Sequence, residues 1–335
     1  MLLRFRPKLI LLLLLGYLLV SPSLLLAKQT LVQDQIFKVF EEYKSAIVRV
    51  KAAYKKEAEE GKPSQINLRV GTGFFVSLEG HVLVNASRAI GADHVQVEYQ
   101  GISYPAESLG HDPITNVSLL RLLKLPESFE VIRFDLAMEE PAIGTLVVSI
   151  AAPLDLAPSP SFGMIGGFDK KLGDKIFPTA YLRTTIPIGA GQGGCPILDL
   201  NGRLIGMSVA SIPDMNGSYC LPVSALASVK DDLLYSGKPD RGWIGLEVKE
   251  NISEQNEHNV YISKIIASSP AKEAGLKEGD LIISLSDIPV KRIIDLPSAI
   301  FKTRIDRYAP IKVIRGDKTL SFSIKAVERP QAEAP

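Results

Sequence analysis

The feature that most constrains this sequence is a series of short runs rich in β-branched and apolar residues, separated by turn residues, from about residue 67 onward. The turns carry pairs such as Glu79-Gly80, Gln100-Gly101 and Asn201-Gly202. Many short strands at close spacing are typical of a β-barrel or a β-sandwich. The expected strands are residues 68–76, 81–85, 94–99, 117–122, 145–150, 181–185, 196–200 and 203–208.

Short helices are expected at both ends of this β-rich region. Apolar residues at helical spacing (Ile36, Val39, Phe40 and Tyr43) predict a helix before a strand at 46–50. Residues 55–63 are charged and contain Gly and Pro, which indicates a solvated loop. Residues 224–235 are expected to form a short closing helix.

A second unit follows a compact linker at residues 236–240, which read Ser-Gly-Lys-Pro-Asp. Its expected strands are 244–248, 260–265, 280–285, 311–314 and 320–324, with helices at 270–274 and 297–304. The expected domains are therefore 28–235 and 241–328. The tail, 329–335, is rich in Pro and Ala and is expected to be disordered.

The N-terminus has the pattern of a secretory signal peptide over residues 1–27. Arg4, Arg6 and Lys8 precede an apolar run from 9 to 20, and Ala27 offers a small residue for cleavage. The alternative is an uncleaved inner-membrane anchor, because leucines at 24–26 lengthen the apolar stretch. Either reading places the body of the protein outside the cytoplasm, as a periplasmic or secreted protein.

Charge and metal-ligand patterns exclude some functions. With 38 basic and 37 acidic residues, the net charge of +1 gives no electrostatic reason to expect a nucleic-acid partner. The four histidines do not cluster, and neither Cys195 nor Cys220 has a metal-ligand spacing. We therefore expect no metal and no cofactor.

Three segments, in order, carry a resemblance to a known family. They are Gly-Thr-Gly-Phe-Phe-Val at 71–76 with the run 80–90, Asp-Pro-Ile-Thr-Asn-Val at 112–117, and Gly-Gln-Gly-Gly-Cys-Pro at 191–196. In this order they resemble the motifs of HtrA-type (Deg-type) trypsin-like serine proteases. The resemblance implies a mainly β fold, a chymotrypsin/trypsin-like double β-barrel.

The same resemblance implies that the catalytic-triad positions are Ser87, Asn116 and Gly193. Ser/His/Asp chemistry needs a base, a carboxylate that orients it, and a nucleophilic hydroxyl. Serine has no basic nitrogen, an amide carries no negative charge, and glycine has no side chain. The chain is therefore expected to be a pseudoprotease with a degenerate triad.

Other residues near these motifs were weighed as replacements. His81 and His94 lie six residues before and seven residues after the base position, outside the motif register. Cys195 offers a thiol nucleophile but has no evident His partner. The resemblance places Cys195 and Cys220 on neighbouring strands, so they are a small buried thiol pair or a disulfide. By the same resemblance, Gly191 and Gly193 supply the backbone donors of the oxyanion hole.

The second unit resembles the PDZ domain of the same family. Arg241-Gly242-Trp243-Ile244-Gly245-Leu246 is similar to its carboxylate-binding loop, and residues 268–282 are similar to its Ser-Pro-Ala…Ala-Gly-Leu…Gly-Asp signature. The resemblance implies an α+β PDZ domain that captures a peptide C-terminus as an added strand. Trp243 is alternatively a packing residue. The implied peptide-binding residues are Gly242, Trp243, Ile244, Gly245, Leu246 and Ile300. By the same resemblance, the N–H groups of Trp243, Ile244 and Gly245 hold the carboxylate, and Ile244, Leu246 and Ile300 form the apolar pocket.

Three functions follow from these readings. The first is a PDZ-containing pseudoprotease that binds peptide C-termini, unfolded chains or an active HtrA relative without cleaving them. The second is an active serine endopeptidase of envelope quality control, and the third is an oligomeric scaffold. The family resemblance also implies a homo-oligomer, a trimer. Whether the degenerate groove still accepts a peptide or has collapsed is open at this point.

Overall fold

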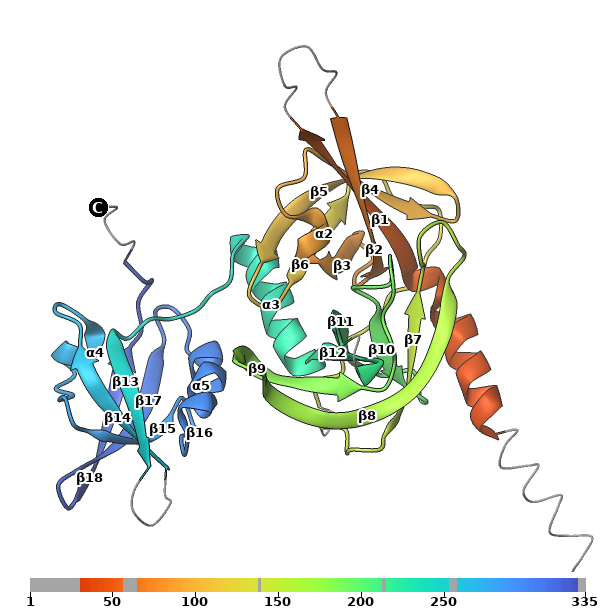
Figure 1. Cartoon of the computed structure of the whole chain (residues 1–335). Coiled ribbons are helices and arrows are strands. Elements are labelled where there is room, and N and C mark those ends of the chain that lie inside the picture. The colour runs from red at the N-terminus through yellow and green to blue at the C-terminus, as the bar shows by residue number, and fades with distance from the viewer. Residues whose placement is uncertain (1–30, 57–64, 138–139, 213–214, 253–257, 331–335) are drawn as a thin grey trace, which may run out of the picture.

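Two closed six-stranded β-barrels occupy residues 47–222 (Figure 1). The structure is a computed structural model that describes residues 31–56, 65–137, 140–212, 215–252 and 258–330. The expected signal peptide, most of the charged loop at 55–63 and most of the expected tail lie outside these residues. The two barrels confirm the expected mainly β, trypsin-like double-barrel fold.

The first barrel has the strand order β1-β2-β3-β6-β5-β4. Its strands are β1 (Ile47–Lys56), β2 (Gln65–Phe75), β3 (His81–Asn85), β4 (His94–Tyr99), β5 (Ile102–Asp112) and β6 (Val117–Leu122). The second barrel has the order β10-β11-β12-β9-β8-β7. Its strands are β7 (Leu146–Ala151), β8 (Ser159–Leu172), β9 (Lys175–Thr184), β10 (Pro196–Asp199), β11 (Leu204–Ile212) and β12 (Gly217–Pro222).

Two long strands were not expected from the sequence. β5 contains Pro105 and Gly110, and β8 contains Pro160 and three glycines, residues that are depleted in ordinary strands. Both strands bend, and each has register shifts: β5 against β6 near Gly110, and β8 against β9 at two places. Such irregularities let a strand curve around a barrel, and they also break the alternation by which strands are recognised.

Helical segments flank the barrels. Residues 31–43 are helical, as expected, and lead through η1 (Lys44–Ala46) into β1; the short α2 (Ala86–Ala89) follows β3. The helix α3 (Val223–Ser236) follows β12 and packs against β5 and β6 of the first barrel as well as β11 and β12 of the second. Within the described residues, no helix combines the length and apolar character needed to cross a membrane.

The main core lies between the two barrels. Phe74, Leu83 and Leu119 of the first barrel form one buried cluster with Leu198 and Met207 of the second. Val39 of the N-terminal helix and Leu226 and Leu233 of α3 complete this cluster. Because side chains from both barrels share one core, the loops at the barrel junction are held in fixed relative positions.

The C-terminal unit is a β-sheet with two short helices, as expected for a PDZ domain (Figure 1). Its sheet has the order β13-β14-β15-β17-β18, with β16 paired to β15, so β13 is an edge strand. The elements are β13 (Leu246–Ile252), β14 (His258–Ile265), α4 (Pro270–Glu273), β15 (Leu281–Leu285), β16 (Ile288–Pro289), η3 (Ile293–Asp295), α5 (Leu296–Lys302), β17 (Tyr308–Arg315) and β18 (Lys318–Lys325).

Buried ion pairs join the C-terminal unit to the barrels. Arg241 forms a two-pronged pair with the fully buried Asp112, and Arg304 forms another with Asp232 of α3. Helix α5 contacts β9, and its Phe301 packs against the core between the barrels. At the linker, a Cβ on Gly110 would lie 2.2 Å from the Gly237 carbonyl oxygen, so only glycine permits this approach.

Candidate functional site

Ser87, Asn116 and Gly193 come from three loops that meet where the two barrels join. Ser87 lies on α2 directly after β3, Asn116 lies in the turn between β5 and β6, and Gly193 lies between β9 and β10. The Ser87 backbone N–H donates to Asn116 Oδ1 at 2.8 Å. A Cβ added to Gly193 would lie 2.9 Å from a terminal atom of the Asn85 amide. The structure therefore brings the three positions together at the junction of the barrels.

The Asn116 side chain connects the two barrels. Its Nδ2 donates to the Val209 carbonyl of β11 at 2.8 Å, while its Oδ1 accepts from Ser87. A carboxylate at this position could make only the second bond, because it has no proton to offer the carbonyl of Val209. Asn116 also has φ of 60°, a conformation that Asn tolerates better than most residues. The amide is thus suited to a structural role at this turn.

The loop that carries Gly191 and Gly193 is held by one buried threonine. Thr72 Oγ1 donates to the Gly191 carbonyl at 2.8 Å, and the Thr72 N–H donates to the Gly193 carbonyl at 3.1 Å. Thr72 lies within the motif at 71–76, but the sequence alone did not indicate this role. Within the described part of the chain, the N–H groups of Gly191 and Gly193 have no acceptor. The two expected oxyanion donors therefore remain available to a ligand carbonyl.

No residue that was weighed as a replacement catalyst is suited to that task. His81 lies at the opposite end of β3 from Ser87, where Nδ1 bonds to Ser77 Oγ at 2.7 Å. Burial lowers the pKa of His81, against a smaller opposing effect of Glu79. Cys195 is fully buried, and burial raises its pKa to about 12, so the reactive thiolate is disfavoured at neutral pH.

Cys195 and Cys220 are both unpaired thiols in the core of the second barrel. Burial raises the pKa of Cys220 as well, with a further contribution from nearby Cys195. A disulfide between them stays a prediction. Within the described residues, no cluster of three or more His, Cys, Asp or Glu side chains has a metal-binding arrangement.

The loop at residues 241–246, which is expected to bind a peptide carboxylate, leads into the edge strand β13. The Ile244 carbonyl accepts from the Ala271 N–H at 2.9 Å, and the Gly245 carbonyl accepts from the Ile266 N–H at 3.0 Å. Their own N–H groups have no acceptor among the backbone bonds of the described residues. Gly245 has φ of 78°, which places this loop in a conformation that favours glycine. A peptide C-terminus could therefore bind to these N–H groups and add to β13.

Two expectations for this loop need correction. The Trp243 N–H is not free, because it donates to the Val327 carbonyl at 2.8 Å in an isolated bridge between the two ends of the unit. Ile244 is only 8% exposed and belongs to the unit's core, so it does not line an open pocket. Ile300, in contrast, is 46% exposed on α5, where it remains available to a peptide side chain.

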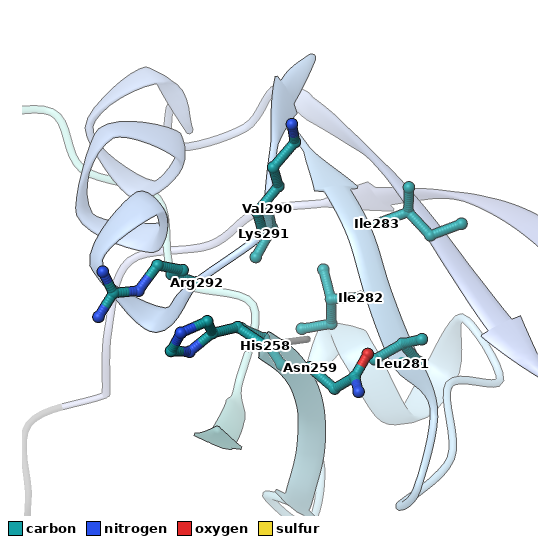
Figure 2. A pocket seen from close by; sticks show the side chains of 9 residues that line it. His258, Asn259, Leu281, Ile282, Ile283, Val290, Lys291 and Arg292 are labelled. Carbon is teal, nitrogen blue, oxygen red and sulfur yellow. The ribbon is translucent and has the colours of Figure 1, made fainter. Parts of the chain in front are cut away.

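A cavity of about 510 Å³ lies elsewhere in the C-terminal unit, between β14, β15 and the segment after β16 (Figure 2). Val260, Ile282 and Val290 form a buried apolar floor. His258 bonds to Glu250 through Nδ1, and Arg292 lies 3.6 Å from the same carboxylate, so much of the basic character of the rim is already neutralised. None of its lining residues belongs to the carboxylate-binding loop or to α5. The full lining is His258, Asn259, Val260, Leu281, Ile282, Ile283, Val290, Lys291 and Arg292.

Comparison with known proteins agrees with both parts of the fold. Residues 71–207 match the trypsin-like peptidase domain family, and residues 242–326 match the PDZ domain family. A Pseudomonas putida (strain W619) protein named probable periplasmic serine endoprotease DegP-like is 25% identical over 284 residues, which cover 79% of this chain and 57% of that protein. A protein of the same name from Chlamydia trachomatis serovar D is 24% identical, covering 81% of this chain and 56% of the relative. The chain thus spans little more than half the length of these curated relatives.

Solved structures show the same architecture. The HtrA-type protease AlgW with a decapeptide superposes with a TM-score of 0.72 at 18% identity, covering 89% of this chain and 99% of that one. The serine endoprotease from Yersinia pestis gives a TM-score of 0.64 at 21% identity, covering 88% and 98%. At these identities the structural likeness establishes the fold. Together with both domain matches and the DegP-like relatives, it identifies this chain as a trypsin-like peptidase domain joined to a PDZ domain, similar in both parts to HtrA-type proteases.

Proposed function

We propose that this chain is an HtrA-like pseudoprotease that binds extended peptides or partner proteins without cleaving them. The observation that carries the proposal is the junction of Ser87, Asn116 and Gly193. These positions lie together, yet they supply neither an imidazole base nor a carboxylate, and the position of the nucleophile has no side chain. Losing one member of a triad already reduces turnover by orders of magnitude.

Peptide binding is supported by the backbone that remains. The unpaired N–H groups of Gly191 and Gly193 and those of Ile244 and Gly245 are the donors that each domain needs to hold an extended chain. The edge strand β13 and the exposed side chain of Ile300 complete the second of these surfaces. The names of the DegP-like relatives support a periplasmic location, which agrees with the N-terminal pattern. We also propose a homo-oligomer, with an active HtrA relative as a candidate partner.

The first test concerns cleavage. The purified chain is incubated with casein and with a serine-reactive fluorophosphonate probe, beside an active trypsin-like protease. We expect no hydrolysis and no labelling of this chain. Hydrolysis that disappears in Ser87→Ala or Cys195→Ala would contradict the proposal, because it would identify a working nucleophile and favour an active endopeptidase.

The second test concerns binding by the C-terminal unit. One peptide library is prepared in two forms, with free C-terminal carboxylates and with C-terminal amides. Binding of both forms is measured for the wild type and for Ile300→Glu. We expect binding that requires the free carboxylate and is lost in the variant, because an apolar C-terminal side chain would have to desolvate the glutamate carboxylate. Binding of no free C-terminus would refute peptide capture and favour the scaffold function. Lys318→Glu, an exposed site on β18, is the matched control.

A further inference from the structure

Two arginine side chains flank Ser87 at the junction of the barrels. Arg88 follows Ser87 on α2, and Arg69 comes from β2. Arg69 Nη1 donates to the Ser87 carbonyl at 3.2 Å, and its guanidinium stacks 4.3 Å from the centre of the Tyr54 ring. The Tyr54 hydroxyl in turn donates to the Arg88 carbonyl at 2.9 Å. These contacts hold the side chain of Arg69 and the backbone of Arg88 beside Ser87.

Arg88 lies against the loop that carries the nucleophile position. A Cβ built on Gly71 would lie 2.9 Å from Arg88 Cγ and 3.5 Å from the Gly193 carbonyl oxygen. The stem of Arg88 and the backbone of Gly193 thus meet at the same point of β2. The Arg88 side chain therefore leaves α2 beside the backbone of the loop that carries Gly191 and Gly193.

The charges of these two arginines are not compensated within the described residues. Neither forms an ion pair there, and Arg88 Nε is buried without an acceptor. Burying a charged donor without a partner is unfavourable, so an acceptor from a ligand would be stabilised at this point. Among the described acidic side chains on the strands of the first barrel, Glu98 pairs with Arg49 and Lys51, Glu107 with Arg121, and Asp112 with Arg241.

We propose that Arg88 and Arg69 form a subsite for the carboxylate side chain of an acidic peptide bound along the degenerate groove. The planar guanidinium presents paired N–H donors that match a carboxylate, and charge-assisted bonds of this kind are strong. This inference rests on the proposed function in one respect, namely that the groove accepts a peptide. It goes further by naming the side-chain class that the groove selects.

The test uses three fluorescent peptides that are acetylated at the N-terminus and amidated at the C-terminus, so that carboxylate capture by the C-terminal unit does not contribute. They share a Gly/Ala/Leu background and differ at one central residue, which is Glu, Gln or Lys. Affinities are measured by fluorescence anisotropy at low salt. We expect the Glu peptide to bind the wild type roughly tenfold or more tightly than the Gln peptide. We expect Arg88→Gln to remove this preference.

A second variant keeps the test informative if Arg88→Gln folds poorly. Arg69 is exposed, so Arg69→Glu alters the charge without disturbing a core, and we expect it to shift the preference toward the Lys peptide. Lys124→Glu, an exposed residue just after β6, makes the same charge change and should leave the preference intact. Equal binding of the Glu and Gln peptides by the wild type, or no binding of either, would overturn the subsite.

The outcomes for the subsite and for the proposed function are separable. If the wild type binds the Glu and Gln peptides equally while free C-termini still bind at Ile300, the subsite alone is refuted. Cleavage of the Glu peptide would refute the pseudoprotease function, while a preference that depends on Arg88 would still support the subsite.

Discussion

Replacing Arg241 with alanine should destabilise the junction between the C-terminal unit and the barrels. Arg241 donates twice to the carboxylate of Asp112, whose side chain is fully buried, and its guanidinium also lies 5.5 Å from the centre of the Phe301 ring. Removing one partner of a buried ion pair costs about 3–5 kcal/mol, because the other charge stays buried without compensation.

The expected magnitude lies at the lower end of that range. Asp112 keeps bonds from Thr115 Oγ1 at 2.6 Å and from the Ile114 N–H at 3.1 Å, and the Arg241 side chain is 19% exposed, so water reaches this edge. We therefore expect a loss of about 3 kcal/mol, which corresponds to a fall in Tm of about 12–24 °C for a unit of the size of the C-terminal one.

Urea unfolding followed by two signals measures this loss. Trp243 is the only tryptophan of the chain and lies two residues from Arg241, so its fluorescence reports on the C-terminal unit, while circular dichroism reports on both units. The control is Lys238→Ala, which removes an exposed ion pair with Glu328 and should leave stability nearly unchanged.

A double-mutant cycle isolates the ion pair itself. If Arg241 acts through Asp112, the double variant Arg241→Ala/Asp112→Asn should be less destabilised than the sum of the two single variants by about 2 kcal/mol. Strict additivity of the two single effects would refute the reasoning, as would an Arg241→Ala variant as stable as the Lys238→Ala control.

Three other perturbations give expected outcomes. Asn116→Asp should lower the free energy of unfolding by about 1–3 kcal/mol, because it replaces the donor to the Val209 carbonyl with an acceptor. It should not create caseinolytic activity, and an unchanged Tm would argue against the hydrogen bond between Asn116 and Val209. Cys195 and Cys220 should react with iodoacetamide at pH 8 only after denaturation, as measured by mass spectrometry. A disulfide would block the reaction until it is reduced. Rapid labelling of the native protein would contradict the burial of both thiols. A hydrogen bond from the Ile293 N–H, aided by His258 and opposed by burial, lowers the pKa of Glu250. The stability that ionised Glu250 contributes is therefore present above its unfolded pKa of about 4.5 and is lost as the pH falls through the folded value. The free energy of unfolding of Glu250→Gln should depend less on pH below 4.5 than that of the wild type, and an identical dependence would exclude this contribution.

Much of the candidate site was predictable because its signals are local. The motif order placed Ser87, Asn116 and Gly193 in three loops, and the alternating apolar patterns of β3, β4 and β6 gave these strands the expected bounds. The short helix α4 followed from Pro270 at its first turn and Gly275 after its end. In each case the relevant physical preference acts within about ten residues of the chain.

The partners of individual atoms were not predictable in this way. The Asn116 amide bonds to Val209, 93 residues away, and Arg241 bonds to Asp112, 129 residues away. The Trp243 N–H was expected to receive a peptide carboxylate, but the chain end brings Val327 to it instead. The bent strands β5 and β8 were missed because their prolines and glycines suit curvature in a closed barrel and break a local strand pattern.

The sequence by itself therefore determined the class of fold and the residue types at the expected triad positions, because motifs and periodicity are properties of neighbouring residues. Only the tertiary structure decided which donors are free, which charges are paired, and that Arg69 from β2 and Arg88 from α2 both lie beside Ser87. Hydrogen bonds and ion pairs depend on distance and direction in space, and those are set when barrel closure brings remote segments together.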